Sequence, residues 1–210
     1  MIEDLIMKGA EELRQRDRAL DGVMENARRA RILSKQAILK LHNGDTEGAH
    51  KILKDANALL DEMNSIIGAH PALGCFDQIS AALEEYCEAS ILLGLQIDGC
   101  FPDPGTLGVP ITSYLLGLGD VPGELRRQAL DALREGDLET AKERLDSMEE
   151  IYLGLVTMEE APLLRGLRRK MDIARGVIER TRSEVTAETG RKRLWEEISR
   201  LSDKLREQDL

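Results

Sequence analysis

The chain has 210 residues, of which 3% are aromatic and 32% are charged, and its formal net charge is -10 at pH 7. This surplus of acids excludes a protein that coats nucleic acid by bulk electrostatics, although a local basic surface can still bind a polyanion. Alanine, leucine, glutamate and arginine dominate the composition, which is typical of an all-α protein. No Pro/Ser-rich linker divides the chain, so we expect a single domain over residues 1–210.

The cysteines and the apolar runs indicate the cellular compartment of the protein. Cys75, Cys87 and Cys100 show no CxxC spacing and form an odd set, which favours neither a disulfide framework nor a zinc site. The N-terminus lacks the basic and apolar parts of a signal peptide. The longest apolar run, residues 89–95, is far shorter than the roughly 20 residues of a membrane span. We therefore expect a soluble, cytoplasmic protein with no membrane partner.

The spacing of apolar residues predicts a bundle of six or seven helices with long first and late members. Asp21-Gly22 is expected to slacken the first helix, Pro122-Gly123 to kink or divide the fourth, and Gly190 to separate the last two. In chain order, the predicted helices cover residues 2–41, 45–67, 75–97, 110–134, 137–159, the stretch after Pro162 to about 188, and 191–206.

One short pattern occurs twice, 92 residues apart. Each copy contains a Gly-Asp pair, which suits a left-handed helix C-cap followed by an N-cap. Two similar helix corners are favoured over a tetratricopeptide array, because the 34-residue period of such arrays is absent. The first copy is Leu41, Gly44, Asp45, Glu47, Ala49 and Leu53, and the second is Leu133, Gly136, Asp137, Glu139, Ala141 and Leu145.

An acidic stretch, Glu84-Glu85-Tyr86-Cys87-Glu88, lies within the otherwise apolar third helix. Glu85 and Glu88 are three residues apart and share one helical face. Like charges held this close repel one another unless a cation or a proton joins them. A hard divalent metal ion is one solution, and a solvated helix face is the alternative.

A second acidic pair, Asp120 and Glu124, flanks Pro122. If the helix continues through the proline, the two acids share a face, and antiparallel packing on the third helix would gather four carboxylates. Oxygen ligands of this kind suit magnesium or manganese, and two such ions activate water and stabilise the leaving oxygen of a phosphodiester. Equally, Asp120 caps a helix that restarts at Pro122, with Glu124 favoured in its first turn.

These motifs resemble a known family. Residues 85–89, Glu-Tyr-Cys-Glu-Ala, resemble the Glu-Tyr-x-Glu-Ala segment of the translin-associated factor X (TRAX) branch of the translin family. Residues 114–125 resemble its Tyr-Leu-Leu-Gly…Asp-x-x-Gly-Glu-Leu segment. The resemblance extends to residues 31–42, where Ser34-Lys35 and Leu41-His42 fit, and in helical character to residues 167–182.

This resemblance implies a seven-helix all-α subunit that cleaves single-stranded RNA inside an oligomeric cage. It implies that Glu85, Glu88, Asp120 and Glu124 bind Mg²⁺, with Mn²⁺ as an alternative, and act as the catalytic carboxylates. Residues 71–77 lack the basic segment that translin carries, so the chain is similar to the catalytic partner. The implied assembly is a homo-oligomer, hexamer or octamer, or a hetero-oligomer with a translin-like subunit, and single-stranded DNA is a second possible ligand.

RNA binding requires basic residues, and two clusters are candidates for an RNA-facing wall. Residues 165–182 carry a net charge of +5. For any one cation, a solvated face with ion pairs is an equal alternative. Tyr114 and Trp195 have the rings to stack on bases, but packing in the core or at an interface is the favoured use of each. The candidate RNA-binding residues are Arg28, Arg29, Arg31 and Lys35 on the first helix and Arg165, Arg168, Arg169 and Lys170 on the late one.

Two other functions remain open. A non-catalytic helical subunit that binds nucleic acid or acts as a scaffold would carry the same acids without using them. All-α nucleoside triphosphate pyrophosphohydrolases use a Glu-Glu-x-x-Glu motif that Glu84, Glu85 and Glu88 match, but their later Glu-x-x-Asp partner is missing here. Magnesium-dependent endoribonuclease activity is therefore the prediction.

Overall fold

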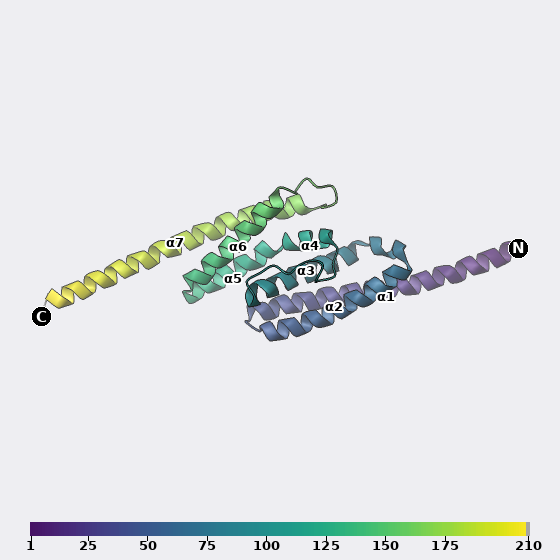
Figure 1. Cartoon of the computed structure of the whole chain (residues 1–210), viewed down its shortest axis with the longest axis horizontal. Helices are drawn as coiled ribbons and strands as arrows, with labels where there is room; N and C mark the ends of the chain where they lie inside the picture. Colours follow the sequence, from purple (N-terminus) through teal and green to yellow (C-terminus); the bar gives the residue numbers. More distant parts are fainter. Residues whose placement is uncertain (209–210) are drawn as a thin grey trace. The chain divides into compact units, whose positions relative to one another are not determined.

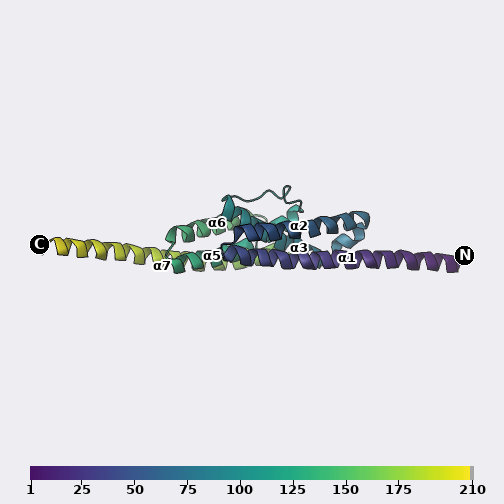
Figure 2. The ribbon, with the colours of Figure 1, turned by 90° about the horizontal axis from the view of Figure 1, so that it is seen from below.

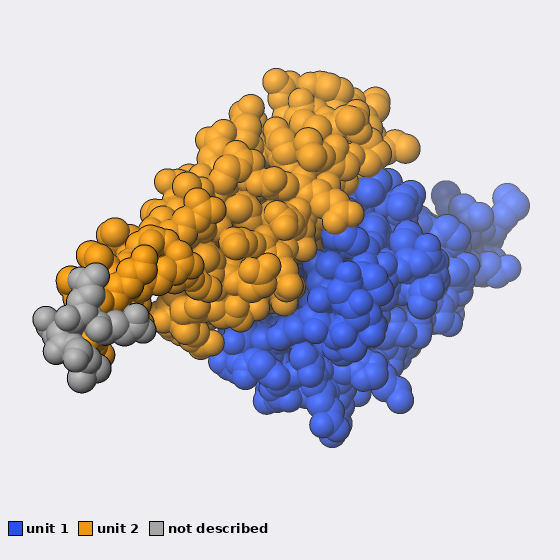
Figure 3. All heavy atoms as spheres, turned by 60° about the vertical axis from the view of Figure 1, so that its left-hand side comes forward, with its two compact units in different colours: residues 1–118 blue, residues 119–210 orange. Residues whose placement is uncertain are grey.

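The computed structural model describes residues 1–208, which form seven α-helices and one short 3-10 helix and contain no strand (Figures 1 and 2). The predicted all-α fold with long first and late helices is confirmed. Contacts divide the chain into two compact units, residues 1–118 and 119–210 (Figure 3). A single domain over residues 1–210 stays a prediction, and the two units are described in turn.

The first unit is a helical bundle in which α1 packs against α2 and α3, and α3 packs against α4. A short turn joins α1 to α2, as is usual for antiparallel neighbours. Within this unit, the N-terminal half of α1 continues beyond α2 (Figure 1). Its elements are α1 (Ile2–His42), α2 (Thr46–Ala69), the 3-10 helix η1 (Pro71–Cys75), α3 (Asp77–Ile97) and α4 (Ile111–Leu118).

Buried residues at alternating spacings of four and three form the seam of α1, and the small ones at its centre allow the neighbouring helices to pack closely. The single first helix that the sequence predicts is confirmed, because α1 runs through Asp21-Gly22 without interruption; the slackening there stays a prediction. A lone glycine costs a helix about 1 kcal/mol relative to alanine, which is too little to break a helix that is packed on one side. The seam residues are Val23, Ala27, Ala30, Ser34, Ala37 and Leu41.

The two predicted helix corners are confirmed. Gly44 and Gly136 both adopt positive φ angles, 75° and 81°, which a residue without a Cβ tolerates. Asp45 then accepts a hydrogen bond from the Gly48 amide at 2.8 Å and begins α2. Asp137 accepts one from the Thr140 amide at 3.0 Å and begins α6.

In the second unit, α7 packs against both α5 and α6. Pro122 lies in the first turn of α5, where a missing N–H is tolerated, so the proline begins a new helix rather than kinking a continuous one. The expected break at Gly190 is wrong: α7 continues through it, because Gly190 keeps a helical φ and costs only about 1 kcal/mol. The helices are α5 (Val121–Glu135), α6 (Leu138–Val156) and α7 (Leu167–Gln208).

None of the helices described over residues 1–208 is long and apolar enough to cross a membrane.

Candidate functional site

The acidic turn of α3 lies where α4 comes closest to it. A Cβ added at Gly117 would lie 2.5 Å from the Glu84 carbonyl oxygen, 2.8 Å from Cys87 Cβ and 3.2 Å from the Glu88 nitrogen. Only glycine allows this backbone approach. The loop after α3 is fixed to the same unit, because the Tyr114 hydroxyl donates to the Pro102 carbonyl at 2.8 Å. The acidic turn is therefore held in a rigid setting.

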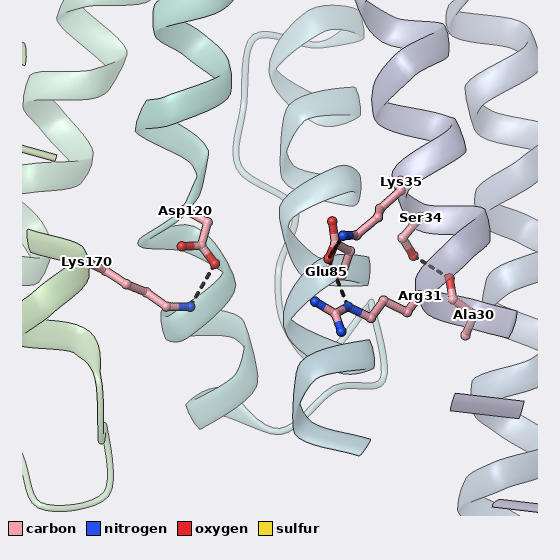
Figure 4. Close-up of polar contacts among 7 residues, drawn as sticks. All are labelled: Ala30, Arg31, Ser34, Lys35, Glu85, Asp120 and Lys170. Carbon is pink, nitrogen blue, oxygen red and sulfur yellow. Dashed lines mark hydrogen bonds and ion pairs between the residues drawn. The ribbon is translucent and has the colours of Figure 1, made fainter. Parts of the chain in front are cut away.

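Glu85 is paired with two of the predicted RNA-binding residues (Figure 4). Arg31 Nε donates to Glu85 Oε2 at 3.3 Å, and Lys35 Nζ lies 3.6 Å from the same oxygen. The Glu85 side chain is only 15% exposed, whereas those of Arg31 and Lys35 are 49% and 55% exposed. The structure thus places Glu85, a predicted metal ligand, directly beside Arg31 and Lys35, which are predicted to bind RNA phosphates.

Asp120 shows the same kind of pairing within the second unit. It occupies the N-cap position of α5, but its side chain makes no capping hydrogen bond. Instead, Lys170 Nζ donates to Asp120 Oδ2 at 2.7 Å (Figure 4). Glu124 lies in the first turn of α5 and is half-buried. Asp120 therefore takes the capping position without the capping role that the sequence offered as an alternative.

The four predicted metal ligands are distributed over both units: Glu85 and Glu88 lie on α3, and Asp120 and Glu124 lie at the start of α5. No group of three or more His, Cys, Asp or Glu side chains within residues 1–208 forms a metal-binding cluster. The donors are all carboxylate oxygens, which Mg²⁺ and Mn²⁺ prefer. At Glu85, Arg31 and Lys35 lie beside Oε2, so a metal ion bound to this oxygen would have to displace them. The gathering of all four acids stays a prediction.

The remaining cations of the predicted RNA-binding set lie on exposed surfaces. Arg28 forms a two-pronged ion pair with Glu25, with hydrogen bonds of 3.0 and 2.9 Å. Arg168 donates to Glu160 at 3.1 Å. Such exposed pairs are weak, about 0–1 kcal/mol each, and a polyanion can compete for them. The side chains of Arg29, Arg165 and Arg169 are also exposed.

An open groove of about 500 Å³ follows α1 and reaches the start of α3. The sequence analysis missed this groove. Its signal was present in the spacing, because Arg28, Arg31 and Lys35 fall at i, i+3 and i+7 and therefore share a helical face. Seven residues line it: Met24, Ala27, Arg28, Arg31, Ile32, Lys35 and Gln78.

A partly buried polar cluster that the sequence analysis also missed joins α5 to α7. Arg126 donates to Thr181 Oγ1 at 2.8 Å and to both oxygens of Glu184, at 2.9 and 3.0 Å. The Arg126 side chain is largely buried. This two-pronged pair fixes the helix that carries Asp120 and Glu124 against the helix that carries Lys170.

Cys87 and Tyr114 have structural roles. Burial, with a smaller contribution from the negative charge of Glu84, raises the pKa of the Cys87 thiol to about 12. The thiol therefore stays protonated at neutral pH, and Cys87 is the small buried residue that the sequence indicated. Tyr114 is also buried, which confirms packing as its use, whereas Trp195 lies exposed on α7 rather than in the core.

Comparison with known proteins gives consistent matches over most of the chain. The translin family profile matches residues 19–183. A curated relative, an uncharacterised protein of Methanocaldococcus jannaschii, is 29% identical over 166 residues, which cover 78% of this chain and 73% of the relative.

Three solved structures have the same fold. The structure of an AfC3PO–duplex RNA complex matches with a TM-score of 0.80 at 34% identity, and a crystal structure of AfC3PO matches with 0.78 at 35%; each match covers 90% of this chain and 97% of the other. Apo-NeC3PO matches with 0.80 at 25% identity, over 87% of this chain and 96% of that one. The chain belongs to the translin family.

Proposed function

We propose that this chain is a magnesium-dependent endoribonuclease of the TRAX type that binds and cleaves single-stranded RNA in the cytoplasm. The observation that carries the proposal is the pairing at Glu85, where a largely buried carboxylate lies beside Arg31 and Lys35. Phosphodiester hydrolysis by metal ions needs this combination: carboxylates to hold the metal and cations to hold the phosphate next to it.

Glu85, Glu88, Asp120 and Glu124 would hold Mg²⁺, or Mn²⁺ in its place. The bound ions would supply an activated water and neutralise the charge on the leaving oxygen. The gathering of all four acids around the ions is part of this proposal.

The similarity to AfC3PO, which was solved in complex with duplex RNA, supports an RNA ligand for this chain. Arg28, Arg29, Arg31 and Lys35 on α1 and Arg165, Arg168, Arg169 and Lys170 at the start of α7 would bind its phosphates. We propose single-stranded RNA as the substrate, with single-stranded DNA as the alternative that the experiment must test.

The proposed assembly is a homo-oligomer, hexamer or octamer, unless a translin-like second subunit completes it. Residues 186–206 of α7 contain no buried side chain, yet Leu194, Ile198, Leu201 and Leu205 repeat with heptad spacing on one exposed stripe. Glu197 and Lys204 flank this stripe. Antiparallel pairing with the same stripe of a second copy would place opposite charges beside each other and cover the apolar residues.

Replacing both Ile198 and Leu201 by Asp should lower the mass of the assembly, because each change puts a charge into the proposed contact. Light scattering coupled to size-exclusion chromatography measures this mass. Ser199→Asp adds a charge to the same helix outside the stripe and should leave the mass unchanged. An unchanged mass of the double variant would contradict the contact.

The function is tested by incubating pure protein with labelled single-stranded RNA, duplex RNA and single-stranded DNA, with and without Mg²⁺. Endonucleolytic products from single-stranded RNA only in the presence of Mg²⁺ are expected. RNA retention without cleavage would instead support a non-catalytic binding or scaffold subunit. Release of pyrophosphate from nucleoside triphosphates would support a pyrophosphohydrolase.

A further inference from the structure

The groove on α1 combines two kinds of surface. Its apolar part consists of Met24, Ala27 and Ile32, and Ile32 is 42% exposed although it is aliphatic. The cations Arg28, Arg31 and Lys35 line the same groove. An apolar surface surrounded by positive charge fits a ligand that has one flat apolar part and one anionic part.

The size and the chemistry of the groove match one nucleotide. A volume of about 500 Å³ lies in the range typical of small-molecule sites, roughly 300–1,000 Å³. Proteins that recognise single-stranded RNA hold splayed bases against aromatic rings or Arg guanidinium planes, and their cations bind the phosphates. None of the seven lining residues is aromatic, so Arg28 would supply the stacking plane and Ile32 the apolar contact.

We propose that this groove binds one unstacked nucleotide of the RNA, with its base against Ile32 and its phosphate at Arg31 and Lys35. The inference rests on the proposed function in that RNA is the ligand. It adds a subsite, defined by named residues, that binds a base of any sequence. Such a subsite prefers a single strand, because the bases of a duplex stay stacked.

The subsite is linked to the acidic turn through shared residues. Arg31 and Lys35 line the groove and also pair with Glu85 Oε2. A phosphate in the groove competes for both cations and leaves the Glu85 carboxylate available to a divalent cation. Binding of the nucleotide and binding of the metal should therefore strengthen each other, because coupling between two ligands is reciprocal.

The test compares a labelled oligoadenylate with its abasic counterpart in fluorescence anisotropy, using the full chain without Mg²⁺ so that no cleavage occurs. Ile32→Ser should weaken oligoadenylate binding by about fivefold or more, the lower end of a base-stacking contact, and leave abasic binding unchanged. Leu39→Ser removes an exposed aliphatic residue from α1 outside the groove, since Leu39 is 54% exposed against 42% for Ile32. This control should bind both probes like the parent protein.

A second measurement follows the coupling. Mn²⁺ binding, detected by electron paramagnetic resonance, should tighten two- to fivefold when oligoadenylate is present, which is about the strength of a half-exposed ion pair. Lys35→Gln should tighten Mn²⁺ binding in the absence of RNA and reduce the further gain from RNA. Equal Mn²⁺ affinities in all these states would overturn the coupling.

Two outcomes would overturn the subsite itself. One is an equal loss of affinity for oligoadenylate and for its abasic counterpart in Ile32→Ser, which would mean that the groove contacts only the RNA backbone. The other is a change in assembly mass with unchanged RNA affinity, which would make the groove a contact between copies. Failure of the proposed function would look different. The parent protein would then bind RNA in a base-dependent way but would not cleave it in the presence of Mg²⁺.

Discussion

Glu88→Gln and Asp120→Asn should each abolish magnesium-dependent cleavage of single-stranded RNA and leave the fold intact. Both changes keep the shape of the side chain and remove the negative charge that holds a divalent cation. Even residues that only support metal ligands contribute about 10- to 100-fold to metal affinity or activity, so loss of a direct ligand should reduce the rate by at least about a hundredfold.

The fold should survive these substitutions for a physical reason. Asp120 loses its ion pair with Lys170, but the Asp120 side chain is 41% exposed, and such pairs contribute about 0–1 kcal/mol. Glu12→Gln is the matched control, because it removes an exposed carboxylate that pairs with Arg16 on α1 far from the acidic turn in sequence. It should cleave like the parent protein.

The measurements are single-turnover cleavage with excess protein, Mn²⁺ affinity, and circular dichroism with light scattering. Reduced cleavage together with reduced Mn²⁺ affinity identifies the acid as a ligand. Reduced cleavage with unchanged Mn²⁺ affinity assigns it a role in orienting water or RNA instead. Undiminished cleavage by both variants would end the endonuclease proposal.

Much of the fold was predictable from local sequence, because helix signals are local. The Gly-Asp corners at 44–45 and 136–137 gave two helix starts, since the left-handed glycine and the capping carboxylate act within a few residues. The predicted break at Gly190 was wrong, because a single glycine costs a helix only about 1 kcal/mol and does not by itself end it. In the structure α7 tolerates it.

The candidate site was predictable only in part. Spacing along a helix pairs Glu85 with Glu88 and Asp120 with Glu124, and the motif resemblance implied a metal-binding role for all four. No spacing rule links Arg31 to Glu85, which is 54 residues further along the chain, or Arg126 to Glu184. These pairs depend on which helices pack together and in what register, which is tertiary information.

The pairings at Glu85 and Asp120 would allow an acidic chain to carry the proposed RNA site. Each carboxylate is neutralised by cations from the set predicted to bind RNA: Arg31 and Lys35 at the first and Lys170 at the second. In the free protein each carboxylate is held by these cations, two at Glu85 and one at Asp120. A bound phosphate would take over the cations, and a bound metal ion would take over the carboxylates.

Gly117→Ala should destabilise the protein, although alanine is a better helix former than glycine. The new Cβ would lie 2.5 Å from the Glu84 carbonyl oxygen, a backbone atom that no side-chain rotation can move. Overpacking of this kind typically costs about 1–3 kcal/mol. For a chain of this size each kcal/mol lowers Tm by about 2–4 °C, so a decrease of about 2–12 °C is expected in thermal unfolding followed by circular dichroism.

Gly68→Ala is the control that separates crowding from helix propensity. Gly68 lies in α2 with no atom within 4 Å of an added Cβ, so this variant should be unchanged or more stable by up to about 1 kcal/mol. The same substitution should therefore have opposite effects at the two positions. Because Gly117 sets the spacing between α4 and the acidic turn, Gly117→Ala should also slow cleavage below the unfolding temperature. Equal stability of the two variants would show that α4 does not pack on Glu84 as closely as described.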